Sequence, residues 1–288
     1  MKRIKKKTGS LHKLVFYDIR SGFRSNRMKL PIFMGLCIFI CIMGARSISG
    51  IMEMQGVKAT VTDYVCYMVG GPKHIPEGML DIYTIPVLWL ALQVMVAYVS
   101  GYYAATDLHT YGQQILIRTG SRYKWWISKC IWNIITVVSM YAIIYISSVV
   151  TAFFSGADFK NRLTPEIAVS ACNINMLGGS RKEITIILFV MPVLVSVSLS
   201  MSQMTIALIT SPIIGFIASQ SIVFISTIYE QKFLISNYGM LSHNKITCMS
   251  GIVYQDGIVI SIVVFFISIA AGTVYFKRCN ILPKNQDI

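Results

Sequence analysis

The sequence predicts an all-α, polytopic membrane protein with six transmembrane helices. Of its 288 residues, 55% are apolar and 13% are charged, whereas a soluble domain carries about 25% charged residues. The mean hydropathy is +0.62, and several long stretches carry no charge. Too few charges remain to cover a water-facing surface. The composition therefore excludes a soluble enzyme, a disordered chain and a small secreted domain held by disulfides.

The six expected spans are apolar stretches close to the ~20 residues that a helix needs to cross a bilayer. They are residues 30–48, 82–105, 127–155, 184–201, 204–228 and 257–276. The fourth and fifth spans come from one charge-free stretch that is too long for one helix, so we expect a turn near Ser200–Gln203. A re-entrant helix pair is the alternative there.

The two terminal segments, residues 1–29 and the tail 277–288, are basic and are expected in the cytoplasm. Within the first segment, Arg20 and Arg24 share one helical face and apolar residues share another, which predicts an amphipathic helix lying at the membrane surface. The first apolar stretch is longer than the ~7–15 residues of a signal-peptide core, so we expect an uncleaved anchor.

The distribution of charge predicts the orientation. The chain has 26 Lys and Arg against 12 Asp and Glu. With both termini on one side of the membrane, 17 of the bases but only 3 of the acids lie on that side. The positive-inside rule then places both termini in the cytoplasm. Because the bases flank apolar stretches, we expect contact with membrane lipids and no binding of nucleic acid.

The loop between the second and third spans has the pattern of a short helix. Leu108, Tyr111 and Ile115 would share one face, and Asp107 would begin the helix as its N-cap. Such a helix is either a handle for a soluble partner or an ordinary connection. Trp125 and Trp126 follow, and we expect their rings at the membrane interface.

The stretch 85–132 resembles the permease subunits of type-2 ABC exporters, especially those of Gram-positive bacteria. The residues that carry this resemblance are Asp107, Arg118, Gly120, Ser121, Arg122, Trp125, Trp126 and Lys129. The resemblance extends to the whole chain through the basic N-terminal helix, the six spans, the short turn between spans four and five, and a longer outer segment, 230–256. In that family the outer segment often forms short re-entrant helices, whereas here Lys232, His243 and Lys245 are expected to keep it near water.

The resemblance implies the membrane-spanning subunit of an ATP-driven exporter in the bacterial plasma membrane. A separate ABC-type ATPase subunit would bind ATP and Mg, and a second permease chain, identical or related, would complete the pathway. The substrate would be a peptide antibiotic, a lipid or a drug. The docking residues implied for the ATPase are Asp107, Leu108, Tyr111, Gln114, Ile115, Arg118 and Arg122.

Missing motifs agree with a chain that has no catalytic residue and no cofactor or metal of its own. The sequence has no G-x-x-x-x-G-K-[ST] phosphate loop, no H-E-x-x-H and no G-x-S-x-G. No expected span carries an acid, His or Lys near its middle, which argues against ion-coupled transport and intramembrane catalysis. A membrane sensor or scaffold protein is the alternative function.

The seven cysteines are an odd number, which excludes a complete disulfide framework. Cys66, Cys172 and Cys248 fall in expected outer segments, where one pair could oxidise. The interpretation that we favour from the sequence is that they are free thiols packed as small apolar residues. The serines and threonines of spans four and five have two interpretations as well: close helix packing, which we favour, or a polar-lined path.

Overall fold

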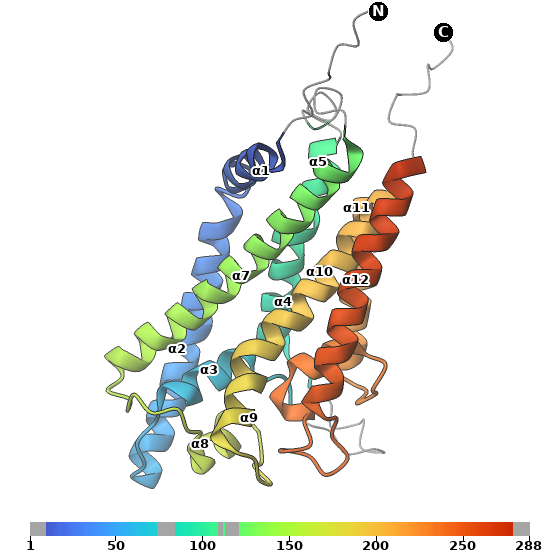
Figure 1. The fold of residues 1–288 in the computed structure, drawn as a ribbon. Coiled ribbons are helices and arrows are strands. Elements are labelled where there is room, and N and C mark those ends of the chain that lie inside the picture. The colour runs from blue at the N-terminus through green and yellow to red at the C-terminus, as the bar shows by residue number, and fades with distance from the viewer. Residues whose placement is uncertain (1–9, 74–83, 109–111, 113–120, 279–288) are drawn as a thin grey trace, which may run out of the picture.

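The computed structural model describes residues 10–73, 84–108, 112 and 121–278. This part of the chain is a bundle of long helices with short helices at both ends (Figure 1) and no β-strand, which confirms the all-α class. Helical segments long and apolar enough to cross a membrane are Lys29–Gln55, Val87–Leu108, Arg122–Phe154, Arg181–Ile209 and Tyr254–Arg278. They lie within or around five of the six predicted spans.

Two helices form the start of the described chain. α1 (Leu11–Ser25) lies across the end of the bundle at a steep angle to α2 (Lys29–Gln55), as Figure 1 shows. Leu14, Asp18 and Gly22 form its buried face. The helix is present where the sequence predicted one, and its position at a membrane surface stays a prediction.

The second and third long segments are α4 (Val87–Gly101) with α5 (Tyr103–Leu108), and α7 (Arg122–Phe154). α4 begins directly after Pro86, so this proline precedes the helix and does not interrupt it. α7 begins five residues before the predicted span because Ser121 caps it, accepting a hydrogen bond from the backbone N–H of Lys124 at 3.4 Å.

The fourth long segment bends through a π-helical turn. It comprises α9 (Arg181–Thr185), η2 (Ile186–Val190) and α10 (Met191–Ile209). Pro192 has no N–H to donate to the carbonyl of Leu188, four residues before it. The hydroxyl of Tyr145 in α7 donates to this carbonyl at 3.2 Å and to that of Phe189 at 3.0 Å. The proline thus disturbs the helix where a neighbouring helix supplies a donor.

The turn between the fourth and fifth predicted spans lies at Thr210–Ser211, so its prediction near Ser200–Gln203 was wrong. α10 continues through those residues. Their serines do not end the helix because they bond its own carbonyls; Ser202 donates to the carbonyl four residues before it at 3.1 Å. Ser211 instead caps α11 (Pro212–Ser226) by accepting from the N–H of Ile214 at 3.3 Å.

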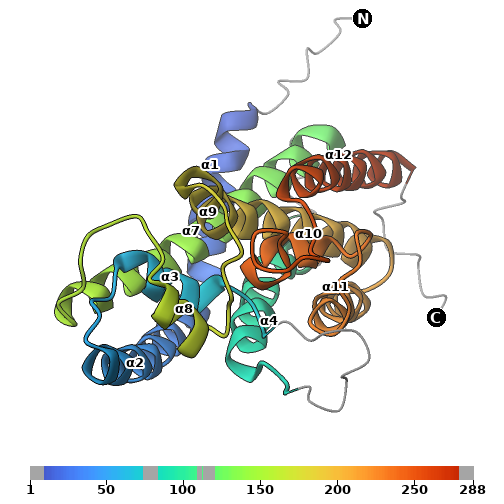
Figure 2. The ribbon, with the colours of Figure 1, turned by 90° about the horizontal axis from the view of Figure 1, so that it is seen from below.

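The last long helix, α12 (Tyr254–Arg278), packs along α10. In the view from below, α2 and α12 lie on opposite sides of the bundle with α4 and α10 between them (Figure 2). The preceding segment contains two short 3₁₀ helices, η3 (Ile235–Gly239) and η4 (Leu241–His243). The sequence predicted that His243 would keep this segment near water; it is buried, and Nδ1 lies 3.1 Å from Oδ1 of Asn237.

Short helices at the end opposite α1 fill the predicted outer loops (Figure 1). α3 (Val61–Val69) begins at a capping box, in which Thr60 and Asp63 satisfy each other's backbone N–H groups. α8 (Pro165–Ser170) begins at Thr164. The carboxylate of Asp63 also accepts from the N–H of Thr164 at 2.9 Å, so it joins the starts of the two helices.

Small polar side chains inside the bundle bond adjacent helices. Ser198 of α10 donates to the carbonyl of Ser261 in α12 at 2.8 Å. Ser200 donates to Oδ1 of Asn133 in α7 at 2.6 Å, and Gln203 donates to the carbonyl of Ala97 in α4 at 3.1 Å. These contacts support the packing interpretation of the serines in α10, because small residues let helices approach and hydroxyls bond across.

Candidate functional site

A buried ionic cluster lies at the end of the bundle where α1 crosses it. Nζ of Lys129, from the first part of α7, lies 2.5 Å from Oδ1 of Asp18 in α1 and 2.6 Å from Oδ2 of Asp107 in α5. The side chains of the three residues are exposed by only 1%, 3% and 5%. One ammonium therefore joins three helices in a place that water does not reach.

Hydroxyl and aromatic groups complete the surroundings of the cluster. Ser128 donates to Oδ2 of Asp18, and the hydroxyl of Tyr103 donates to Oδ1 at 3.1 Å. Nζ of Lys129 lies 4.6 Å from the ring centre of Tyr103 and 4.9 Å from that of Trp125, where cation–π attraction adds to the ion pairs. Burial raises the pKa of Asp18 above its ordinary value, although Lys129 opposes the shift.

α1 reaches the cluster because Gly22 allows it to lie directly on α7. A Cβ atom at Gly22 would lie 2.2 Å from Cζ2 of Trp132, so only glycine permits this approach. Phe23 meets the same ring edge-on, with ring centres 5.1 Å apart. Asp18 stands one helical turn before Gly22 on the same face, and this spacing places its carboxylate beside Lys129.

Trp125 and Trp126 lie inside the bundle and not at the lipid interface that the sequence predicted. The ring of Trp125 stacks on Phe276 with centres 4.8 Å apart, and Nε1 of Trp126 donates to the carbonyl of Ile269 at 3.0 Å. A Cβ atom at Gly272 would lie 2.2 Å from the ring of Trp126. Gly272 leaves room for the ring of Trp126, so the two tryptophans can be buried against α12. Their contacts hold α7 against α12.

The docking residues predicted for a partner fall into two groups. Those outside the described residues are Tyr111, Gln114, Ile115 and Arg118. Asp107 and Leu108 end α5, and Arg122 begins α7. Asp107 lies in the last turn of α5, where its carboxylate contacts Lys129, and the helix that it was predicted to begin falls outside the described residues. Whether a partner docks on this loop stays a prediction.

The two described ends of this loop are held by different parts of the bundle. Asp107 is tied to the ionic cluster, whereas Nη1 of Arg122 donates to the carbonyls of Phe276 at 3.0 Å and Lys277 at 3.3 Å. These carbonyls belong to the last turn of α12, where a cation also complements the helix dipole. The structure therefore anchors the two flanks of the loop to different parts of the bundle.

Sequence reasoning did not include Asp18, Ser128 and Tyr103 in a site. Only Asp18 carries a signal in the sequence: it stands on the apolar stripe of an amphipathic helix, between Leu14 and Gly22. A charged residue on such a stripe needs a buried partner, because an unpaired buried charge is strongly unfavourable. The partner itself lies 111 residues away and has no local signature.

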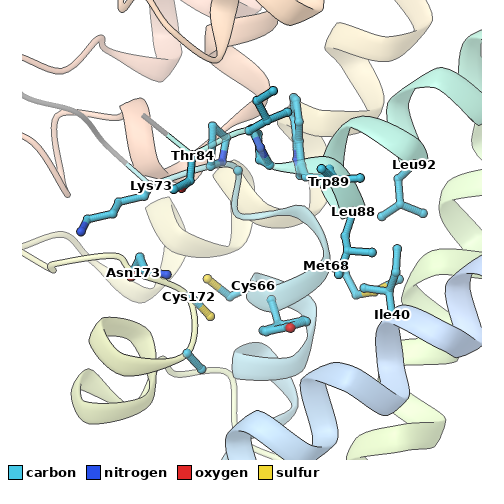
Figure 3. Close-up of a pocket in the computed structure, with 17 residues that line it drawn as sticks. Ile40, Cys66, Met68, Lys73, Thr84, Leu88, Trp89, Leu92, Cys172 and Asn173 are labelled. Atoms are coloured by element: carbon cyan, nitrogen blue, oxygen red, sulfur yellow. The ribbon is translucent and has the colours of Figure 1, made fainter. Parts of the chain in front are cut away.

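A cavity of about 410 Å³ lies at the opposite end of the bundle, among α3, the start of α4 and the segment after α8 (Figure 3). Its lining includes Ile40, Cys66, Met68, Lys73, Leu92, Cys172 and Asn173. Apolar side chains therefore meet polar ones in its walls. Across the ranges that the structure describes, no three His, Cys, Asp or Glu side chains gather to hold a metal ion.

The fold and the apolar helices define a multi-pass helical membrane protein. The chain belongs to the family described as "Protein of unknown function (DUF2705)", whose model matches residues 32–282. Among the curated proteins and the solved structures, none matches the chain.

Proposed function

We propose that the chain is the membrane-spanning permease subunit of an ATP-driven ABC exporter in the bacterial plasma membrane. α11 would be a sixth, short span, and both termini would lie in the cytoplasm with α1 along the inner membrane surface. The partners would be a separate ABC-type ATPase, which binds ATP and Mg, and a second permease chain. The substrate class would be a peptide antibiotic, a lipid or a drug.

The observation that supports this proposal most is the set of bonds made by Lys129. Through Asp18 and Asp107 it joins α1, α5 and α7 at the base of the loop 109–120, where the resemblance implies docking. A subunit that pushes on this loop would move α5. The other two helices would move with it, because separating a buried ion pair leaves an uncompensated charge. The cluster would thus transmit a movement of the loop to the membrane-spanning helices.

Purification of the tagged chain from its native membrane in mild detergents tests the proposal. We expect an ABC-type ATPase to co-elute in equal amount and the preparation to hydrolyse ATP. A chain that elutes without an ATPase and without hydrolysis in several mild detergents would favour a sensor or scaffold.

A matched pair of charge reversals tests the docking loop. Arg118→Glu changes the predicted docking helix, whereas Lys182→Glu changes an exposed position of α9 at the other end of the bundle. We expect Arg118→Glu to reduce both co-elution and hydrolysis, and Lys182→Glu to leave them unchanged. Equal behaviour of the two variants would exclude this loop as the docking site.

A further inference from the structure

Cys66 and Cys172 lie side by side at the end of the bundle opposite α1. Cys66 is in α3, and Cys172 follows α8. Their side chains are buried, with 1% and 9% exposure, and both line the cavity. Figure 3 shows the two sulfur atoms next to one another in the wall of the cavity. Among the other described cysteines, Cys248 instead contacts the hydroxyl of Ser250 at 3.0 Å.

The backbone around this pair is held in place by bonds that do not involve the thiols. The carboxylate of Asp63, one helical turn before Cys66, accepts from the N–H of Thr60 at 2.8 Å and from the N–H of Thr164 at 2.9 Å. The hydroxyl of Thr60 donates to the carbonyl of Arg162 at 2.5 Å. Because α3 and the start of α8 are fixed to each other, the thiols need little further ordering to react, which favours a disulfide over the dithiol.

We propose that Cys66 and Cys172 form a disulfide that joins the segment between spans one and two to the segment between spans three and four. The inference rests on the proposed orientation, in which this end faces away from the cytoplasm, where disulfides persist. The bond would close one wall of the cavity covalently, so that α3 and α8 could not move apart.

The chemistry requires a disulfide-bearing oxidant, such as a thiol–disulfide oxidoreductase or a small disulfide. The thiolate of one cysteine attacks a sulfur of the oxidant, forms a mixed disulfide and releases one oxidant thiolate. The thiolate of the second cysteine then attacks the protein sulfur of the mixed disulfide and releases the other oxidant thiolate. The two cysteines lose two electrons and two protons, and the oxidant leaves as two thiols.

The surroundings of Cys66 determine when this reaction occurs. The neighbouring thiol of Cys172 and burial both raise the pKa of the Cys66 thiol well above its ordinary value. Since the thiolate is the reacting form, the folded dithiol reacts slowly. The disulfide therefore forms while the outer segments are still folding, and the folded chain afterwards neither loses nor gains it quickly.

Counting thiols in the full chain tests the proposal. Membranes from the native host are denatured with a maleimide that adds visible mass to each free thiol. We expect five of the seven cysteines to react without reductant and all seven with it. Cys66→Ser and Cys172→Ser should each give six in both conditions. Cys248→Ser, the matched control, should still show a difference of two thiols between the conditions.

Seven reactive thiols without reductant would overturn the disulfide. To separate that result from a wrong orientation, Asn161→Cys is added to a Cys66→Ser/Cys172→Ser chain, because Asn161 is exposed at the same end. Labelling of intact cells by a membrane-impermeant maleimide at position 161 shows that this end faces outward. If seven thiols react without reductant and position 161 is labelled from outside, the disulfide alone is refuted. If seven thiols react and position 161 is not labelled, the orientation is refuted as well.

Discussion

Nζ of Lys129 lies 2.5 Å from a carboxylate oxygen of Asp18, a residue 111 positions before it. The same ammonium lies 2.6 Å from Asp107, so two buried carboxylates share one buried cation. Hydroxyl groups of Ser128 and Tyr103 donate to Asp18 and offset part of the loss of water around it. Among the residues that the structure describes, Lys129 is the cation that pairs with both carboxylates.

Lys129→Met should therefore be strongly destabilising. The substitution keeps most of the side-chain volume but removes the ammonium that contacts both Asp18 and Asp107. Removing one partner of a buried ion pair costs about 3–5 kcal/mol. Thermal unfolding of the purified chain in detergent measures the loss. A Tm within error of the wild type would show that the carboxylates are not paired as described.

Asp18→Asn is the matched control for this prediction. It leaves one carboxylate, Asp107, with the ammonium of Lys129, and the amide oxygen can still accept a hydrogen bond. We expect a change within about 1 kcal/mol of the wild type, because the remaining pair is balanced. A loss as large as that of Lys129→Met would mean that both carboxylates are needed.

The raised pKa of Asp18 gives the stability a pH dependence of defined sign. Burial raises this pKa, so the folded chain holds the proton more tightly than the unfolded chain does. The contribution to stability is fully present below the ordinary pKa of about 4 and is lost as the pH rises through the raised value. We expect the Tm of the wild type, relative to that of Asp18→Asn, to be most favourable at about pH 4 and to fall towards neutral pH. A difference that is constant or grows with pH would contradict the assignment.

Gly22→Ala should detach α1 from the bundle. The added methyl group would lie 2.2 Å from Cζ2 of the buried Trp132, and a ring in this position has no room to move. Such overpacking costs about 1–3 kcal/mol. Gly35→Ala in α2 is the matched control, since its added Cβ would meet no atom within 4 Å beyond its chain neighbours and the nearby backbone of its own helix. Alanine in a helix interior is favoured over glycine by up to about 1 kcal/mol.

Thermal unfolding of the two glycine variants, together with limited proteolysis near residue 26, measures this difference. Gly22→Ala should lower the Tm and expose the α1–α2 junction to protease, whereas Gly35→Ala should leave the junction protected. Equal proteolysis of both variants would show that α1 does not depend on the contact with Trp132.

The helical class could be predicted from the sequence because long apolar stretches need no tertiary information. The turn at Thr210–Ser211 could not, because a serine that bonds its own helix and a serine that caps the next one look alike in a charge-free stretch. α3 did carry a readable signal, the pair Thr60 and Asp63 at capping-box spacing. The sequence analysis did not predict α3, because its apolar part is too short to cross a membrane.

The ionic cluster could be predicted only in part. Asp107 and Lys129 belong to the pattern that carries the resemblance, but the sequence alone gives no reason to place Asp18 beside them. That contact depends on how α1 lies across α7, which is decided by the absence of a side chain at Gly22. The position of Trp126 depends in the same way on Gly272. Close approaches of this kind join distant residues and leave no periodic pattern.

Tyr145→Phe tests the link between α7 and the π-helical turn. The hydroxyl donates to the carbonyls of Leu188 and Phe189 near Pro192, at 3.2 and 3.0 Å. Without it, the carbonyl of Leu188 loses the donor that replaces the missing N–H of the proline, which costs about 1–3 kcal/mol. Tyr123→Phe, at a ring that is 61% exposed, should change the stability by less than about 0.5 kcal/mol. Hydrogen exchange should also quicken over residues 186–192 in Tyr145→Phe alone; the same exchange in both variants would show that the turn holds itself without the hydroxyl.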